Sequence, residues 1–206
     1  MTRPPPHGSL RRRSVLCALG VAALQAALPA APGAVLALAA TPERALAAEP
    51  ELTTFDISRD EDGVYLAYSV DFDLGKSVDE ALVKAVPLFF VAEAEVFRDR
   101  WYWRDRRVAH AVQVWKIVFQ PLTSTYRVTS VGGLAQNYPT RAEAIAAISR
   151  ATHWKIAEPG QIEEGSRHYV EFNFRLDIAL LPRPMQIGIG GEPDWRLSVK
   201  RTQRIN

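Results

Sequence analysis

The densest group of side chains that could bind a ligand lies in residues 98–107, which read RDRWYWRDRR. Three large aromatic rings stand there among arginines and two aspartates. Aromatic rings stack on sugars or bases and guanidinium groups pair with anions, so this segment could form a ligand, partner or membrane-surface contact. The alternative is a strand end and loop whose tryptophans cover the core while the arginines extend into solvent. The predicted contact residues are Arg100, Trp101, Tyr102, Trp103, Arg104, Arg106 and Arg107.

The remaining polar residues form no recognisable catalytic or metal-binding pattern. After residue 47 the histidines are His110, His153 and His168, and none lies three or four positions from another, so a helical metal pair is excluded. No G-x-S-x-G segment marks a hydrolase nucleophile. His168 falls on the apolar parity of its segment, which favours a core histidine over a ligand or base. We therefore predict no catalytic residue, no metal site and no cofactor.

Two groups of carboxylates could still approach one another. Glu93 and Glu95 are two positions apart in a predicted strand, so they share a face and could act as paired carboxylates. Asp60, Glu61 and Asp62 lie together in a predicted turn. A solvated strand face and a charged turn are the favoured interpretations of these two groups.

Alternation of apolar and polar residues predicts the strands that position these groups. The alternation is clearest in residues 64–74 and 167–178, and a turn at 58–63 joins the former to a preceding strand at 52–57. β-branched and aromatic residues indicate further strands. These further strands are predicted at 88–97, 112–120 and 125–131, with a short final pair at 186–189 and 195–200.

Two short helices are predicted from capping boxes. Ser77 with Glu80, and Thr140 with Glu143, have the spacing at which a hydroxyl and a carboxylate satisfy each other's backbone amides. The helices are expected over residues 80–85 and 143–150. The predicted fold is mainly β (α+β): an antiparallel β-sandwich or open barrel, immunoglobulin-like in general form, with two short helices.

Residues 1–47 are expected to be a cleavable secretion signal. Three arginines at 11–13 precede an apolar run at 14–28, and small residues suit cleavage after Ala47 or Ala39. An uncleaved membrane anchor is the alternative, although prolines interrupt the apolar stretch. The Sec route is expected over the twin-arginine route. These features predict a periplasmic location for the rest of the chain.

Composition supports one exported domain at 48–206. Five of the 25 basic residues but only one of the 23 acidic residues lie in residues 1–47, so the rest is slightly acidic although the whole chain carries +2. Nucleic acid is therefore not an expected partner. The single cysteine, Cys17, lies in the predicted signal, so the exported domain is expected to form no disulfide.

The sequence resembles a family of exported proteobacterial proteins designated domain of unknown function 4390 (DUF4390). The resemblance rests on VPLFFV at 86–91, RWYW at 100–103, LT at 122–123 before YRV at 126–128, and LD at 176–177 before LLPRP at 180–184. It implies an envelope domain without an assigned activity. Members of the family often accompany two-component sensor genes, so the resemblance also implies a sensory or accessory role.

These observations favour a non-enzymatic binding or accessory module linked to envelope sensing. Its expected partner is another envelope protein or the membrane surface. One alternative is a hydrolase acting on an envelope polymer, with His168 and either Glu171 or Asp177 as acid and base, although these carboxylates have the opposite strand parity. Another alternative is a structural or assembly protein that pairs through a sheet edge.

Overall fold

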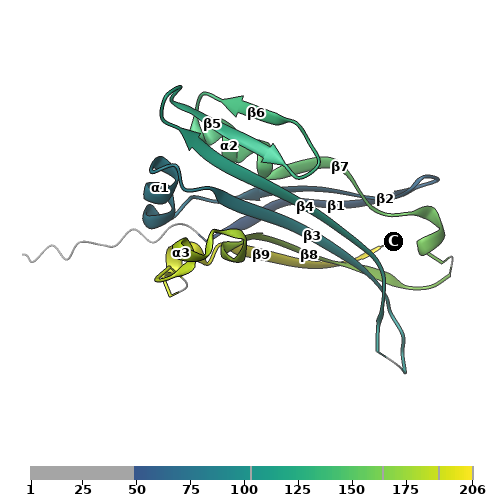
Figure 1. Ribbon diagram of the computed structural model, residues 1–206. Coiled ribbons are helices and arrows are strands. Elements are labelled where there is room, and N and C mark those ends of the chain that lie inside the picture. Colours follow the sequence, from purple (N-terminus) through teal and green to yellow (C-terminus); the bar gives the residue numbers. More distant parts are fainter. Residues whose placement is uncertain (1–48, 103, 164, 190, 206) are drawn as a thin grey trace, which may run out of the picture. The chain divides into compact units, whose positions relative to one another are not determined.

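A computed structural model describes residues 49–205 of the chain except 103, 164 and 190 (Figure 1). The predicted signal at 1–47 and the predicted contact residue Trp103 lie outside the described residues. Within the described part, no helix is long and apolar enough to cross a membrane.

Nine strands of the described chain form two antiparallel sheets. The first sheet has the order β1-β2-β7, with β1 at Glu51–Asp60, β2 at Gly63–Asp71 and β7 at Arg150–Ala157. The second has the order β6-β5-β4-β3-β8-β9. Its strands are β3 (Leu88–Arg98), β4 (Arg106–Gln120), β5 (Thr125–Ser130), β6 (Ala135–Tyr138), β8 (His168–Leu176) and β9 (Ser198–Ile205). The predicted antiparallel sandwich is confirmed.

The core lies between the two sheets because one parity of each central strand is apolar. In β2 and β8 the residues of that parity are buried, as their alternation predicts. Tyr68 of β2 meets Phe172 of β8, with ring centroids 4.7 Å apart, and Trp154 of β7 at 6.1 Å. The contact between Tyr68 and Phe172 joins the two sheets, and burial of each ring contributes about 2 kcal/mol of transfer free energy.

The two predicted helices are present, but the predicted capping box is half formed in one, where the carboxylate bonds to the cap hydroxyl and not to the cap amide, and is missing in the other. In α2 (Arg141–Ile148) the Thr140 hydroxyl accepts from the Glu143 amide at 3.2 Å and donates to the Glu143 carboxylate at 3.0 Å. In α1 (Lys76–Val83) the predicted Ser77–Glu80 box is wrong. There the carboxylate of Asp194 accepts from both the amide and the hydroxyl of Ser77.

Several further sequence predictions need correction. β6 and β7 were not predicted, and the helix expected to reach Arg150 ends at Ile148. The expected strand at 186–189 is wrong, because Pro182 and Pro184 favour the short helix α3 (Arg183–Gln186) and Gly188 has φ +93°. Trp195 belongs to a 3₁₀ turn, η3 (Pro193–Trp195), and the final strand pairs with β8 instead.

The sandwich has two different ends (Figure 1). Helices α1 and α3 lie at one end, together with the β4–β5 turn at residues 121–124. At the other end lie the β1–β2 turn, the β7–β8 connection at residues 158–167, and the tip of the long β3–β4 hairpin. Residues 98–107 make up this hairpin tip, so the predicted contact residues gather at one end of the fold.

Candidate functional site

The hairpin tip, residues 98–107, presents the aromatic side chains of Trp101 and Tyr102 to solvent. Trp101 is 84% exposed and Tyr102 is 74% exposed, and their rings meet edge to face with centroids 5.0 Å apart. The alternative interpretation, in which the tryptophans cover the core, is therefore wrong for Trp101. Exposed rings of this size are available to contact a ligand or partner.

Asp105 holds the tip in its conformation. Its carboxylate accepts from the Arg100 amide at 3.0 Å and from the Tyr169 hydroxyl at 2.8 Å. These two bonds lower the pKa of Asp105, the Arg100 amide having the larger effect. Tyr169 also stacks on Phe97 with centroids 5.3 Å apart, so β8 supports the tip from the side. Asp105 thus has a structural partner on each side, and its lowered pKa keeps it ionised and able to accept both bonds.

The arginines of this region divide into paired and unpaired groups. Arg98 donates to Glu163 at 2.6 Å and Arg107 donates to Glu95. Three guanidinium groups of the tip have no carboxylate partner within the described part of the chain. They belong to Arg100, Arg104 and Arg106. The tip therefore offers positive charge that the fold itself does not neutralise.

A cleft of about 610 Å³ opens between the tip and the β7–β8 connection. Residues 98–102 form one wall and residues 165–167 the other. The Asp99 amide donates to the Arg167 carbonyl at 2.9 Å and joins the two walls at the base. Sequence reasoning identified the first wall from its composition and missed the second, because no local signal places residues 165–167 beside it.

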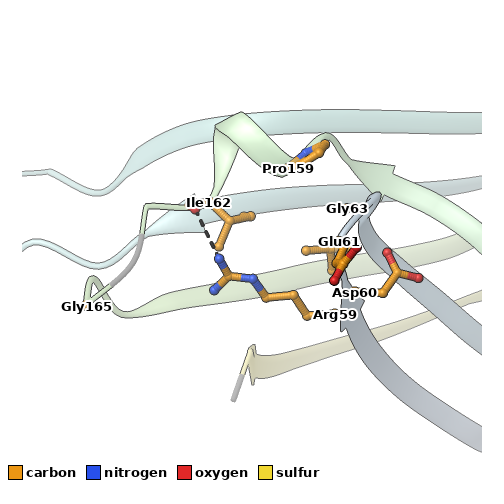
Figure 2. Close-up of a pocket in the computed structure, with 8 residues that line it drawn as sticks. Arg59, Asp60, Glu61, Gly63, Pro159, Ile162 and Gly165 are labelled. Carbon is orange, nitrogen blue, oxygen red and sulfur yellow. Dashed lines mark hydrogen bonds between the residues drawn. The ribbon is translucent and has the colours of Figure 1, made fainter.

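A second cavity, of about 860 Å³, lies between the β1–β2 turn and the β7–β8 connection (Figure 2). Figure 2 shows the Arg59 side chain extending along this cavity, where it donates to the Ile162 carbonyl at 3.5 Å. Asp60 and Glu61 also line it, so its charges are mixed. The Asp60 carboxylate accepts from the Asp62 amide at 2.9 Å, which is the behaviour expected of a charged turn.

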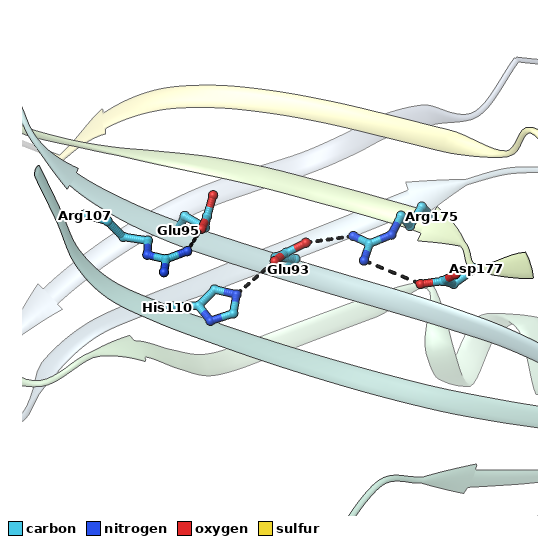
Figure 3. A network of polar contacts seen from close by, with 6 residues as sticks. All are labelled: Glu93, Glu95, Arg107, His110, Arg175 and Asp177. Atoms are coloured by element: carbon cyan, nitrogen blue, oxygen red, sulfur yellow. Dashed lines mark hydrogen bonds and ion pairs between the residues drawn. The ribbon is translucent and has the colours of Figure 1, made fainter. Parts of the chain in front are cut away.

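The outer face of the six-stranded sheet carries a network of ion pairs (Figure 3). As predicted, Glu93 and Glu95 share this face; Glu93 accepts from Arg175 at 2.7 Å and pairs with His110 at 2.9 Å. The Arg175 bond, followed by the His110 bond, lowers the pKa of Glu93. The ligand atoms of Glu93, Glu95 and His110 lie within 4.8 Å of one another and could surround a cation. Arg107 and Arg175 already neutralise these carboxylates, which opposes cation binding.

His168 does not meet the carboxylates proposed with it. It is 3% exposed on the inner face of β8, and its Nδ1 lies 3.1 Å from the Ser166 carbonyl. Burial lowers the pKa of His168, so the neutral ring is favoured. Glu171 lies on the outer face of the same strand, and Asp177 pairs with Arg175 at 3.6 Å. The acid–base pairing of the hydrolase alternative is not assembled among these residues.

Comparison with known proteins gives a family and no activity. A family model described as a domain of unknown function, DUF4390, matches residues 47–205. The chain belongs to the DUF4390 family. No match was found among curated proteins or among solved structures. The match covers the whole sandwich of this DUF4390 domain, including the hairpin tip and both walls of the cleft.

Proposed function

We propose that this DUF4390 protein is a non-enzymatic binding module of the cell envelope, with the hairpin tip as its contact surface. The observation that carries the proposal is the exposure of Trp101 and Tyr102 beside unpaired arginines. Large aromatic rings and arginines are the residues most often responsible for binding energy when a partner covers them. The envelope location rests on the predicted signal at 1–47.

The membrane surface is the partner that this tip fits better. A stable protein interface buries about 800 Å² on each side, which two side chains on one turn do not supply alone. In contrast, indole and phenol rings locate at the lipid headgroup level, and nearby arginines pair with anionic lipids. Trp101 and Tyr102 lie at the turn while Arg98 and Arg106 are strand residues behind it, which suits this arrangement.

Vesicle binding tests the proposal. The protein is sedimented with phosphatidylglycerol-containing vesicles as wild type and as the Trp101→Ala/Tyr102→Ala variant. We expect the double variant to lose about thirtyfold in the ratio of bound to free protein, since each of the two rings contributes on the order of 1 kcal/mol at an interface. Leu122→Ala is the matched control, because Leu122 is 102% exposed on the β4–β5 turn at the opposite end.

The wild type and both variants contain residues 1–47, whose apolar run at 14–28 is expected to add the same vesicle binding to each protein. The effect of a substitution is therefore taken as the binding of the variant relative to that of the wild type. The same proteins are used as bait in envelope extract. If the double variant binds vesicles as the wild type does but loses a defined envelope protein, the partner is a protein. Equal behaviour of the double variant and the wild type in both assays would contradict the proposed surface.

The two other candidate functions have less support. For a hydrolase, His168 and Glu171 lie on opposite faces of one strand. For assembly through a sheet edge, β9 at one edge of the larger sheet carries Lys200, Arg201 and Arg204, and basic residues oppose pairing of that edge with another chain.

A further inference from the structure

The cleft beside the hairpin tip has the size of a ligand site. Its volume of about 610 Å³ lies within the range of roughly 300–1,000 Å³ that is common for sites of small organic ligands. Trp101 and Tyr102 form its aromatic part, and Ser166 and Gly165 form part of the facing wall. A ligand here would contact rings on one side and polar groups on the other.

Three arginines line the same cleft, on both of its walls. Arg98 and Arg100 belong to the hairpin and Arg167 to the β7–β8 connection. Asp99 is the one carboxylate among the described lining residues, and it already lies 3.5 Å from the Arg167 guanidinium. The lining therefore carries an excess of positive charge.

The donors of these arginines are only partly used. The Arg100 side chain, which is half-buried, has no carboxylate partner in the described part of the chain. Arg98 forms one contact, to Glu163, although a guanidinium has five N–H donors. The Arg167–Asp99 separation of 3.5 Å exceeds that of a normal charge-assisted hydrogen bond. An anion in the cleft would supply acceptors for these donors.

We infer that the cleft binds a phosphate group, with Arg98, Arg100 and Arg167 as donors. The planar guanidinium matches two phosphate oxygens at once, and three of them can surround a tetrahedral anion better than a planar carboxylate. Trp101 and Tyr102 would contact the organic part to which the phosphate is attached. The inference rests on the proposed contact surface, because it assigns a chemical group to the same hairpin tip.

A matched pair of variants tests this site. Arg100→Gln and Arg127→Gln each remove one positive charge, but only Arg100 lines the cleft, whereas Arg127 is an exposed residue of β5 outside the hairpin tip. Glycerol 3-phosphate is titrated into each protein by calorimetry. Arg100→Gln is expected to weaken binding about tenfold and Arg127→Gln less than about twofold, since a lost charge-assisted hydrogen bond costs more than a distant charge. Arg100→Lys, which keeps the charge but loses the two-pronged geometry, is expected to lie between them.

Two ligand sources share this chemistry, a soluble phosphate ester and a phospholipid headgroup. Tighter binding to phosphatidylglycerol vesicles than to glycerol 3-phosphate, lost in Arg100→Gln, would assign the site to the headgroup; the reverse order would assign it to a soluble ester. Equal affinities of Arg100→Gln and Arg127→Gln for both probes, with circular dichroism unchanged, would overturn the phosphate site. If Trp101→Ala/Tyr102→Ala still lost vesicle binding in that case, the proposed contact surface would stand without it.

Discussion

Glu93 has two partners on the outer face of the six-stranded sheet, where it accepts from Arg175 and pairs with His110 (Figure 3). Glu171 lies on the same face and has no ion pair among the described residues, and its strand position is directly opposite Glu95. Like charges directly opposite one another in a sheet are unfavourable. Replacement by glutamine is therefore expected to change the free energy of unfolding differently at Glu93 and at Glu171.

We predict that Glu93→Gln lowers the free energy of unfolding by about 0.5–1 kcal/mol, because partly exposed ion pairs contribute on this scale. Glu171→Gln is the control and is expected to leave stability unchanged or to raise it slightly. Urea denaturation at pH 7 measures both. The pKa of Glu93 is lowered in the fold, so its contribution is present above its ordinary pKa and is lost as the pH falls through the lowered value. Equal effects of the two substitutions would contradict this account.

The buried His168 is expected to make the stability of the fold depend on pH. Burial lowers its pKa from the ordinary value of 6.5, so the folded state binds fewer protons than the unfolded state below that pH. Its contribution to stability is therefore complete above pH 6.5 and is lost as the pH falls through the lowered pKa. We expect His168→Gln to reduce the loss of unfolding free energy between pH 7 and pH 5, measured by urea denaturation. An unchanged loss would show that another group is responsible.

At the residue scale the sequence locates half of the candidate site. The composition of residues 98–107 is unusual enough to single out Arg100 and Trp101 without a structure. Nothing local to residues 165–167 predicts that Arg167 faces them across a cleft, because that contact depends on the register between β3 and β8. The pairing of Glu93 with Arg175 depends on the same register and was likewise not predicted.

At the scale of elements, the start of α1 depends on a residue from another part of the chain. Asp194, in η3, accepts from the Ser77 amide at 3.0 Å and from the Ser77 hydroxyl at 2.8 Å. A Cβ at Gly75 would lie 2.5 Å from the Cβ of Asp194, so only glycine allows this close approach. The carboxylate takes the place of a local N-cap and ties η3 to the helix.

We predict that Asp194→Ala lowers the free energy of unfolding by about 1 kcal/mol, the usual cost of losing an N-cap acceptor. Asp194→Asn keeps an acceptor oxygen and is expected to cost only a few tenths of that. In the Asp194→Ala background, Ser77→Ala should have little further effect, since its hydroxyl partner is already absent. Additive losses in this double-mutant cycle, measured by thermal or urea unfolding, would refute the coupling between Asp194 and the Ser77 hydroxyl. Equal losses for Asp194→Ala and Asp194→Asn would refute the role of Asp194 as the cap.

The elements that the sequence predicted are those with strong local patterns. β2 and β8 alternate over their whole length, and Thr140 supplies a local cap for α2. β6 has only four residues, so alternation has no room to develop, and β7 directly follows a helix, which masks its start. The Ser77 box failed because a carboxylate 117 positions away competes for the same groups.

At the scale of the whole molecule, β3 lies at the centre of the larger sheet. It is hydrogen-bonded to β4 on one side and to β8 on the other, and most of its inward side chains are fully buried. The segment around α3 is exposed and short of regular structure. Stability is therefore expected to be unequal across the sandwich.

We predict that amide protons of β3 and β8 exchange with solvent at least about a hundredfold more slowly than those of residues 183–193, because their opening requires near-global unfolding. Hydrogen–deuterium exchange followed by mass spectrometry measures the difference. Comparable exchange in the two regions would show that the larger sheet opens locally and is not the stable centre of the fold.

The length of the β3–β4 hairpin has a mechanical consequence. A force applied at Trp101 along the strands is passed to β3, whose hydrogen bonds to β8 are loaded together in shear. When two strands are pulled along their length, all the hydrogen bonds between them share the tension. When one strand is peeled away from its end, these hydrogen bonds break one after another. We therefore expect tension at the hairpin tip to be transmitted along β3 to the centre of the larger sheet.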